Sequence, residues 1–144
     1  MNKIVKMPKK TAICNFFGFS KNQIPLLKKA AELTLSRQKK EFYQINFILV
    51  SDEQIKKLNI KFRHVRRITD VISFLVFDEM FIGDIYISDN RTKKQAKKYG
   101  HSWDMELAYL VIHGVLHLCG FTDYDERNKK IMFAKQDEIF QCLF

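Results

Sequence analysis

Apolar positions along the chain recur with two different periods, and each period predicts a different kind of element. Between residues 22 and 38 they recur every three or four positions, and Pro25 suits a first turn, which is typical of a helix. From Tyr43 to Leu49 every second residue is large and apolar, which is typical of a strand. The continuous apolar run over residues 71–77 is typical of a buried strand.

Capping residues mark the other elements. Ser51 and Gln54 have the spacing of a capping box that opens a helix, Gly100 closes a helix, and Ser102 begins the next one. We predict strands over 11–17, 43–49, 71–77 and 84–88, the last introduced by Gly83. We predict helices over 22–38, from residue 51, and over 89–99, 103–119 and 126–139. This order favours one α+β domain over residues 1–144, with a four-stranded mixed sheet packed against helices.

Two histidines near the end of the helix over 103–119 are the strongest chemical signal. His113 and His117 are four residues apart, so on a helix they lie one turn apart on the same face. Gly120 follows them and suits the left-handed conformation that ends a helix. The chain can then turn back and bring a third ligand to the two imidazoles.

Two carboxylates after this turn compete for the third position. Asp123 is our first choice and Asp125 is the alternative. Two histidines and a carboxylate suit one zinc ion per chain and leave a fourth position open for water, which zinc can activate near neutral pH. Cys119 faces away from His117 on a helix, so we interpret it as a packing residue.

Composition narrows the setting of this site. No apolar run is long enough to span a membrane, and the basic N-terminus lacks the apolar stretch of a signal peptide. Three widely spaced cysteines without a secretion signal favour reduced thiols and a cytoplasmic protein.

Charge is divided unevenly over a chain of net charge +9. Residues 1–69 hold 16 Lys or Arg against 4 Asp or Glu, whereas residues 70–144 hold 9 against 12. A basic half beside a half that can bind a metal suits a polyanionic substrate such as RNA.

The residue after the first histidine argues against a peptidase. Metalloproteases of the His-Glu-x-x-His pattern use that Glu as a general base, and here the position is Gly114.

Three blocks of sequence resemble one family. The helix reads His-Gly-Val-Leu-His-Leu-Cys-Gly-Phe-Thr-Asp over residues 113–123. Earlier blocks are Leu58-Asn59, Phe62-Arg63 and Thr-Asp-Val-Ile-Ser-Phe over 69–74, and then Gly-Asp-Ile-Tyr-Ile-Ser over 83–88. In this order they resemble the YbeY family of metal-dependent endoribonucleases. The usual third histidine of that family falls on Asp123, which makes the metal a weaker Lewis acid and shifts its preference toward harder ions.

The resemblance implies a single-strand-specific endoribonuclease that matures the 3′ end of 16S ribosomal RNA and acts in ribosome quality control. Ribosomal RNA and the small ribosomal subunit would be its partners. His113, His117 and Arg63 would be catalytic, with Arg63 holding the phosphate through two parallel hydrogen bonds. The expected RNA-binding residues are Lys61, Arg63, His64, Arg66 and Arg67.

The sequence leaves two alternatives open. The chain could be a ribosome-assembly factor with a structural metal and no nuclease activity, or a zinc hydrolase of other substrates. We interpret Asp70 and Ser73 as structural residues rather than groups that support the metal ligands. Glu106 is expected to be a helix N-terminal acid rather than a base.

Overall fold

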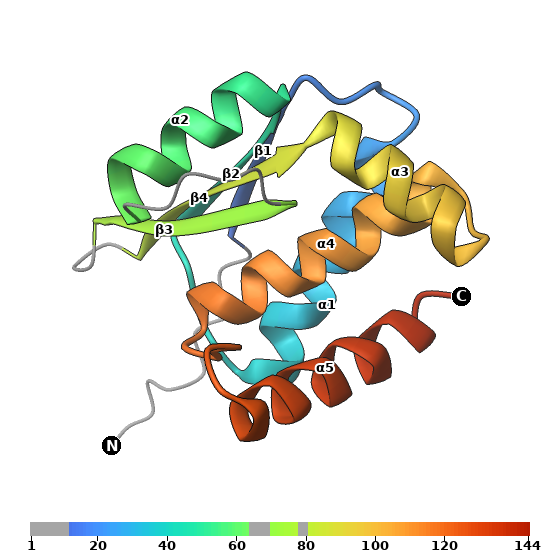
Figure 1. Cartoon of the computed structure of the whole chain (residues 1–144). Helices are drawn as coiled ribbons and strands as arrows, with labels where there is room; N and C mark the ends of the chain where they lie inside the picture. The colour runs from blue at the N-terminus through green and yellow to red at the C-terminus, as the bar shows by residue number, and fades with distance from the viewer. Residues whose placement is uncertain (1–11, 64–69, 78–80) are drawn as a thin grey trace, which may run out of the picture.

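The computed structural model describes residues 12–63, 70–77 and 81–144. Within these residues the chain forms four strands and five helices (Figure 1). The strands are β1 (Ile13–Phe17), β2 (Gln44–Val50), β3 (Val71–Phe77) and β4 (Ile82–Ser88). The helices are α1 (Ile24–Gln38), α2 (Asp52–Arg63), α3 (Asp89–Tyr99), α4 (Trp103–Leu118) and α5 (Glu126–Gln141). Every predicted element is present, and the α+β class is confirmed. The predicted burial of β3 is wrong for Leu75 and Val76, which are 45% and 48% exposed, because β3 is an edge strand.

The strands form one mixed sheet in the order β1-β2-β4-β3. β1, β2 and β4 are parallel, and β3 runs antiparallel to β4 at the edge. β4 begins at Ile82, so Gly83 lies within the strand and does not merely introduce it. Glycine is required at position 83 for steric reasons, because a Cβ there would stand 2.6 Å from a methyl carbon of Leu118. Gly83 therefore lets α4 approach the sheet closely.

Helices cover both faces of the sheet unequally. α1 and α4 lie against one face, and α5 packs on both of them (Figure 1). α2 covers part of the other face over a small core of Val50, Ile55 and Ile72. α4 contacts β3, β4, α1, α3 and α5, so its apolar residues are buried on nearly all sides. The helix that carries the histidine pair is therefore central, with other elements packed on most of its sides.

The predicted caps are confirmed. The Ser51 amide donates to Gln54 Oε1 over 2.9 Å, and the Gln54 amide donates to Ser51 Oγ over 3.2 Å. Ser102 Oγ accepts from the Met105 amide at 3.1 Å at the start of α4. Gly100 closes α3 with φ of 72°.

The three cysteines Cys14, Cys119 and Cys142 are free thiols. Cys119 is half-buried against the main core, as its spacing from His117 predicts, and burial raises its pKa to about 11. Among the described residues, no helix combines the length and hydropathy that crossing a membrane requires.

Candidate metal centre

The last turns of α4 bring two imidazoles together. His113 and His117 are one turn apart, and their Nε2 atoms are separated by 3.1 Å. His113 is buried and His117 is partly exposed. If both rings are neutral with hydrogen on Nδ1, two lone pairs face each other at this distance and repel. A proton or a cation between them removes that repulsion.

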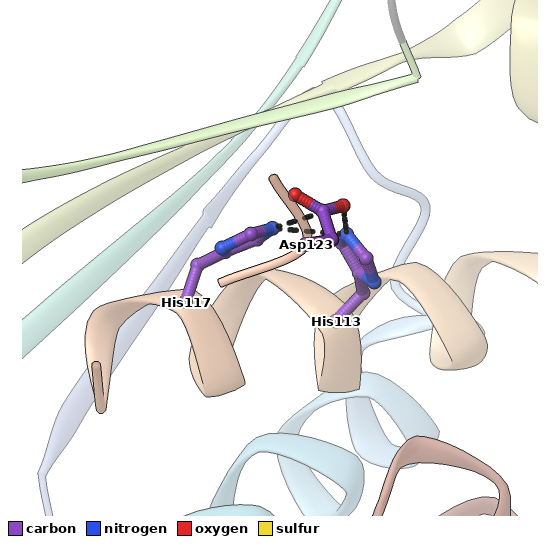
Figure 2. A group of neighbouring side chains, drawn as sticks. All are labelled: His113, His117 and Asp123. Atoms are coloured by element: carbon purple, nitrogen blue, oxygen red, sulfur yellow. Dashed lines mark hydrogen bonds and ion pairs between the residues drawn. The ribbon is translucent and has the colours of Figure 1, made fainter. Parts of the chain in front are cut away.

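The end of α4 returns the chain to the histidines. The Gly120 amide donates to His117 O, the Phe121 amide donates to Leu116 O, and Gly120 has φ of 104°. Few residues other than glycine adopt this conformation without strain. Asp123 Oδ2 then lies 3.6 Å from His113 Nε2 and 3.7 Å from His117 Nε2 (Figure 2).

Hydrogen bonds on the far side of each ring fix its orientation. The carbonyl oxygen of Phe121 accepts from His117 Nδ1 at 3.0 Å, and Gln136 Oε1 accepts from His113 Nδ1 at 2.9 Å. Gln136 Nε2 donates to the carbonyl of Tyr109 at 3.1 Å, which settles which end of the amide faces His113. Both Nδ1 atoms are thus donors, and both Nε2 atoms are directed toward Asp123.

Charge supports this grouping. The hydrogen bond to His113 and the nearby imidazoles outweigh burial and lower the pKa of Asp123 to about 2, so Asp123 is a carboxylate at neutral pH. Burial acts to lower the pKa of His113, but hydrogen bonds to Asp123 and Gln136 outweigh it and raise that pKa above its usual value. The cluster favours positive charge at the point where the three side chains meet.

The three ligand atoms fit one metal ion. Among the described residues, His113, His117 and Asp123 form the group of side chains that could hold a metal ion, with all candidate ligand atoms within 4.8 Å of one another. A tetrahedral zinc ion bonded at about 2.0–2.1 Å would hold its ligand atoms roughly 3.3 Å apart. The separations of 3.1, 3.6 and 3.7 Å lie on both sides of that value.

The alternative carboxylate is engaged elsewhere. Asp125 is the N-cap of α5, where Oδ1 accepts from the Asn128 amide and Oδ2 from the Asn128 side chain, both at 2.8 Å. Between the two candidates that the sequence leaves open, Asp123 is the one that lies beside the histidines.

A cavity of about 710 Å³ opens over these three side chains. Asp70, Ser73 and Phe121 are among the other residues that line it. Ser73 Oγ donates to the carbonyl of Gly114 at 3.0 Å, and Asp70 Oδ2 accepts from Gln95 at 3.2 Å. These contacts connect β3 to α4 and Asp70 to α3. Both residues also line the cavity, and the charge of Asp70 acts to raise the pKa of His113, so the purely structural interpretation of Asp70 stays a prediction.

Gly114 has a packing role that also explains the missing glutamate. A Cβ at this position would stand 2.7 Å from Ile85 Cγ2 and 3.1 Å from Ser73 Oγ. Position 114 therefore faces the sheet, and a glutamate there would collide with the sheet instead of reaching the cavity.

The structure describes only some of the predicted RNA-binding residues. Lys61 is exposed on α2, and α2 ends at Arg63. His64, Arg66 and Arg67 lie outside the described residues, and only the backbone of Arg63 is described. Glu106 lies buried in the first turn of α4, where its Oε1 is 2.6 Å from His101 Nε2, and it is not among the residues that line the cavity.

The sequence reasoning missed Gln136. This residue is fully buried on α5 between Met132 and Ile139, which are also buried. A polar residue on the apolar stripe of a helix is the signal that could have revealed it, because a buried amide needs partners.

The chain is similar to known proteins. A model of the family described as endoribonuclease YbeY matches residues 17–143. The endoribonuclease YbeY of Endomicrobium trichonymphae is 59% identical over 138 residues, covering 96% of this chain and 98% of the relative. That of Caldicellulosiruptor bescii is 37% identical and covers 72% of this chain and 75% of its own length.

A solved structure agrees with the sequence relatives. The solution structure of TM1509 from Thermotoga maritima is 31% identical and superposes with a TM-score of 0.64. The superposition covers 91% of this chain and 89% of that protein. The family model matches residues 17–143, the Endomicrobium trichonymphae relative covers 96% of the chain, and the side chains that could hold a metal ion lie on the motif that carries the resemblance; the chain therefore belongs to the endoribonuclease YbeY family.

Proposed function

We propose that the chain is a metal-dependent endoribonuclease that hydrolyses single-stranded RNA at the cavity over His113, His117 and Asp123. The observation that carries the proposal is the convergence of three ligand atoms from α4 and the loop after it. Three protein ligands in an open cavity are typical of a catalytic zinc site, whereas structural zinc sites have four.

Zinc is the ion that the ligand set suits best. Two imidazoles and one carboxylate match the donors that zinc accepts, and the carboxylate widens the range toward harder ions such as manganese. When bound, the ion supplies Lewis acidity to the phosphate and to a water molecule. The protein holds the two Nε2 atoms in place through Gln136 and the Phe121 carbonyl.

Cations on α2 would hold the substrate. Arg63 ends this helix, and its neighbour Phe62 lines the cavity, so the backbone of Arg63 stands one residue from the cavity wall. A guanidinium here can offer two parallel hydrogen bonds to a phosphate and offset the charge that develops during cleavage. Lys61, His64, Arg66 and Arg67 would contact neighbouring phosphates.

The biological setting follows from the family. The relatives are named endoribonucleases, and we infer that this chain matures the 3′ end of 16S ribosomal RNA on the small ribosomal subunit in the cytoplasm. The peptide hydrolase alternative is disfavoured by Gly114, because position 114 faces the sheet. The family assignment likewise disfavours an assembly factor without nuclease activity.

The role of Arg63 is tested by single-turnover cleavage of a short single-stranded RNA, with zinc measured in the same samples. We expect Arg63→Ala to slow cleavage about a hundredfold, because one preorganised contact to the developing charge is lost. Arg63→Lys should slow cleavage less, because lysine keeps the positive charge but lacks the two parallel donors of the guanidinium. Arg37→Ala, at an exposed position on α1, is the matched control. Wild-type rates for Arg63→Ala would remove this arginine from the mechanism.

A further inference from the structure

Two aromatic side chains line the metal cavity from different elements. Phe62 is on α2 and is 51% exposed, and Tyr124 follows Asp123 in the loop between α4 and α5 and is 77% exposed. α2 and α4 lie on opposite faces of the sheet with the edge strand β3 between them (Figure 1). The cavity therefore has an exposed ring on each of two separate segments, beside the same three ligand atoms.

The Phe62 ring is supported although half of it is exposed. Its centroid lies 4.7 Å from that of Phe74, and Phe74 in turn lies 6.1 Å from Tyr86. These contacts limit the rotamers of Phe62 and leave apolar ring surface in contact with solvent. Exposed aromatic surface at the wall of a polar cavity is a feature of binding sites.

Cations accompany the rings. Lys61 Nζ lies 5.2 Å from the centroid of Phe62, and Lys129, like Tyr124, lines the cavity. Proteins that bind single-stranded nucleic acids combine these two features, with rings stacking on bases and lysines contacting the backbone. A small anionic substrate would need the cations but not the rings.

We propose that Phe62 and Tyr124 stack on the bases on either side of the phosphodiester that lies at His113, His117 and Asp123. This inference rests on the proposed function and gives a physical reason why the enzyme would prefer single-stranded RNA to a duplex. In a duplex the faces of each base are covered by its neighbours, so the rings find a free base only in single-stranded RNA. Phe62 and Tyr124 are thus base-binding residues, whereas the two imidazoles would hold the ion that acts on the phosphate.

The first test measures binding separately from cleavage. Affinity for a short fluorescent single-stranded RNA is measured by anisotropy on the full chain in the presence of a chelator, and KM is measured on the zinc-loaded enzyme. We expect Phe62→Ala and Tyr124→Ala each to lower the affinity for RNA about tenfold and to raise KM by a similar factor, which is the scale for loss of one stacked base. Phe62→Tyr and Tyr124→Phe keep a ring and should bind as the wild type does. Tyr99→Ala, an exposed aromatic on α3 outside the cavity lining, is the control.

The second test removes the base instead of the ring. The same RNA is made with a single abasic nucleotide at each position in turn. At one position, the loss of binding affinity caused by the abasic nucleotide and the loss caused by Phe62→Ala should not add, because both changes delete the same contact. Additive losses at every position, or unchanged binding by both alanine variants, would overturn the inference. Cleavage of RNA by the wild type would still support the proposed function in that case, whereas absence of cleavage would refute the function itself.

Discussion

At the scale of single residues, the site depends on the groups that orient the two histidines as much as on the histidines themselves. Each histidine donates from Nδ1 to an oxygen that can only accept, so both Nε2 atoms are directed to one point. His113 depends on Gln136, a side chain 23 positions away on another helix. The motif alone predicts that two imidazoles lie together, but it does not predict what orients them.

Gln136→Leu should weaken zinc binding about 10- to 100-fold, the usual cost of losing a hydrogen bond that orients a metal ligand. The ring of His113 would lose its acceptor, and the carbonyl of Tyr109 would lose its donor. Zinc affinity is measured by competition with a chromophoric chelator. Gln141→Leu, at an exposed position on the same helix, should have no effect. Equal affinities for the two variants would show that Gln136 does not orient the site.

At the scale of elements, the junction of α4 and α5 separates two aspartates that are two residues apart. Gly120 reverses the chain and brings Asp123 to the histidines, whereas Asp125 caps α5. The strands, the helices and their caps were predictable because each depends on local periodicity and on residues within one turn. The choice between Asp123 and Asp125 was not, because it depends on the path of the turn in space.

Asp123→Ala should therefore abolish tight zinc binding, and Asp125→Ala should leave zinc affinity unchanged. The second variant should lower the melting temperature slightly, because the first turn of α5 loses its side-chain acceptor. Isothermal titration with zinc and thermal unfolding of the same samples distinguish the two effects. If Asp125→Ala lost the metal and Asp123→Ala kept it, the assignment of the third ligand would be reversed.

At the scale of the whole molecule, a basic N-terminal half is joined to a half that holds the side chains that could bind a metal ion. Lys61 and Phe62 on α2 belong to the first half, and α4 belongs to the second. The sheet brings them together, since β3 lies at its edge between the two helices. The order of the strands in the sheet, which makes this approach possible, could not be predicted from local patterns.

Binding to single-stranded RNA should depend strongly on salt. Each phosphate contact made by Lys or Arg should contribute about −0.7 to the slope of log affinity against log salt concentration. Anisotropy measured at several salt concentrations gives this slope. We expect Lys61→Gln to make it shallower by about one such contact, whereas Lys135→Gln on α5 should not change it. Affinity that does not vary with salt would contradict a phosphate-binding role for the basic half.

The central claim is that one metal ion at His113, His117 and Asp123 enables RNA cleavage. Its most direct test is to titrate zinc into the metal-free protein and follow single-turnover cleavage of a short single-stranded RNA. We expect the rate to rise until about one equivalent per chain and then to level off, and His117→Ala to show no rise over that range. Cleavage at full rate by the thoroughly chelated protein, or an unchanged titration curve for His117→Ala, would contradict the claim.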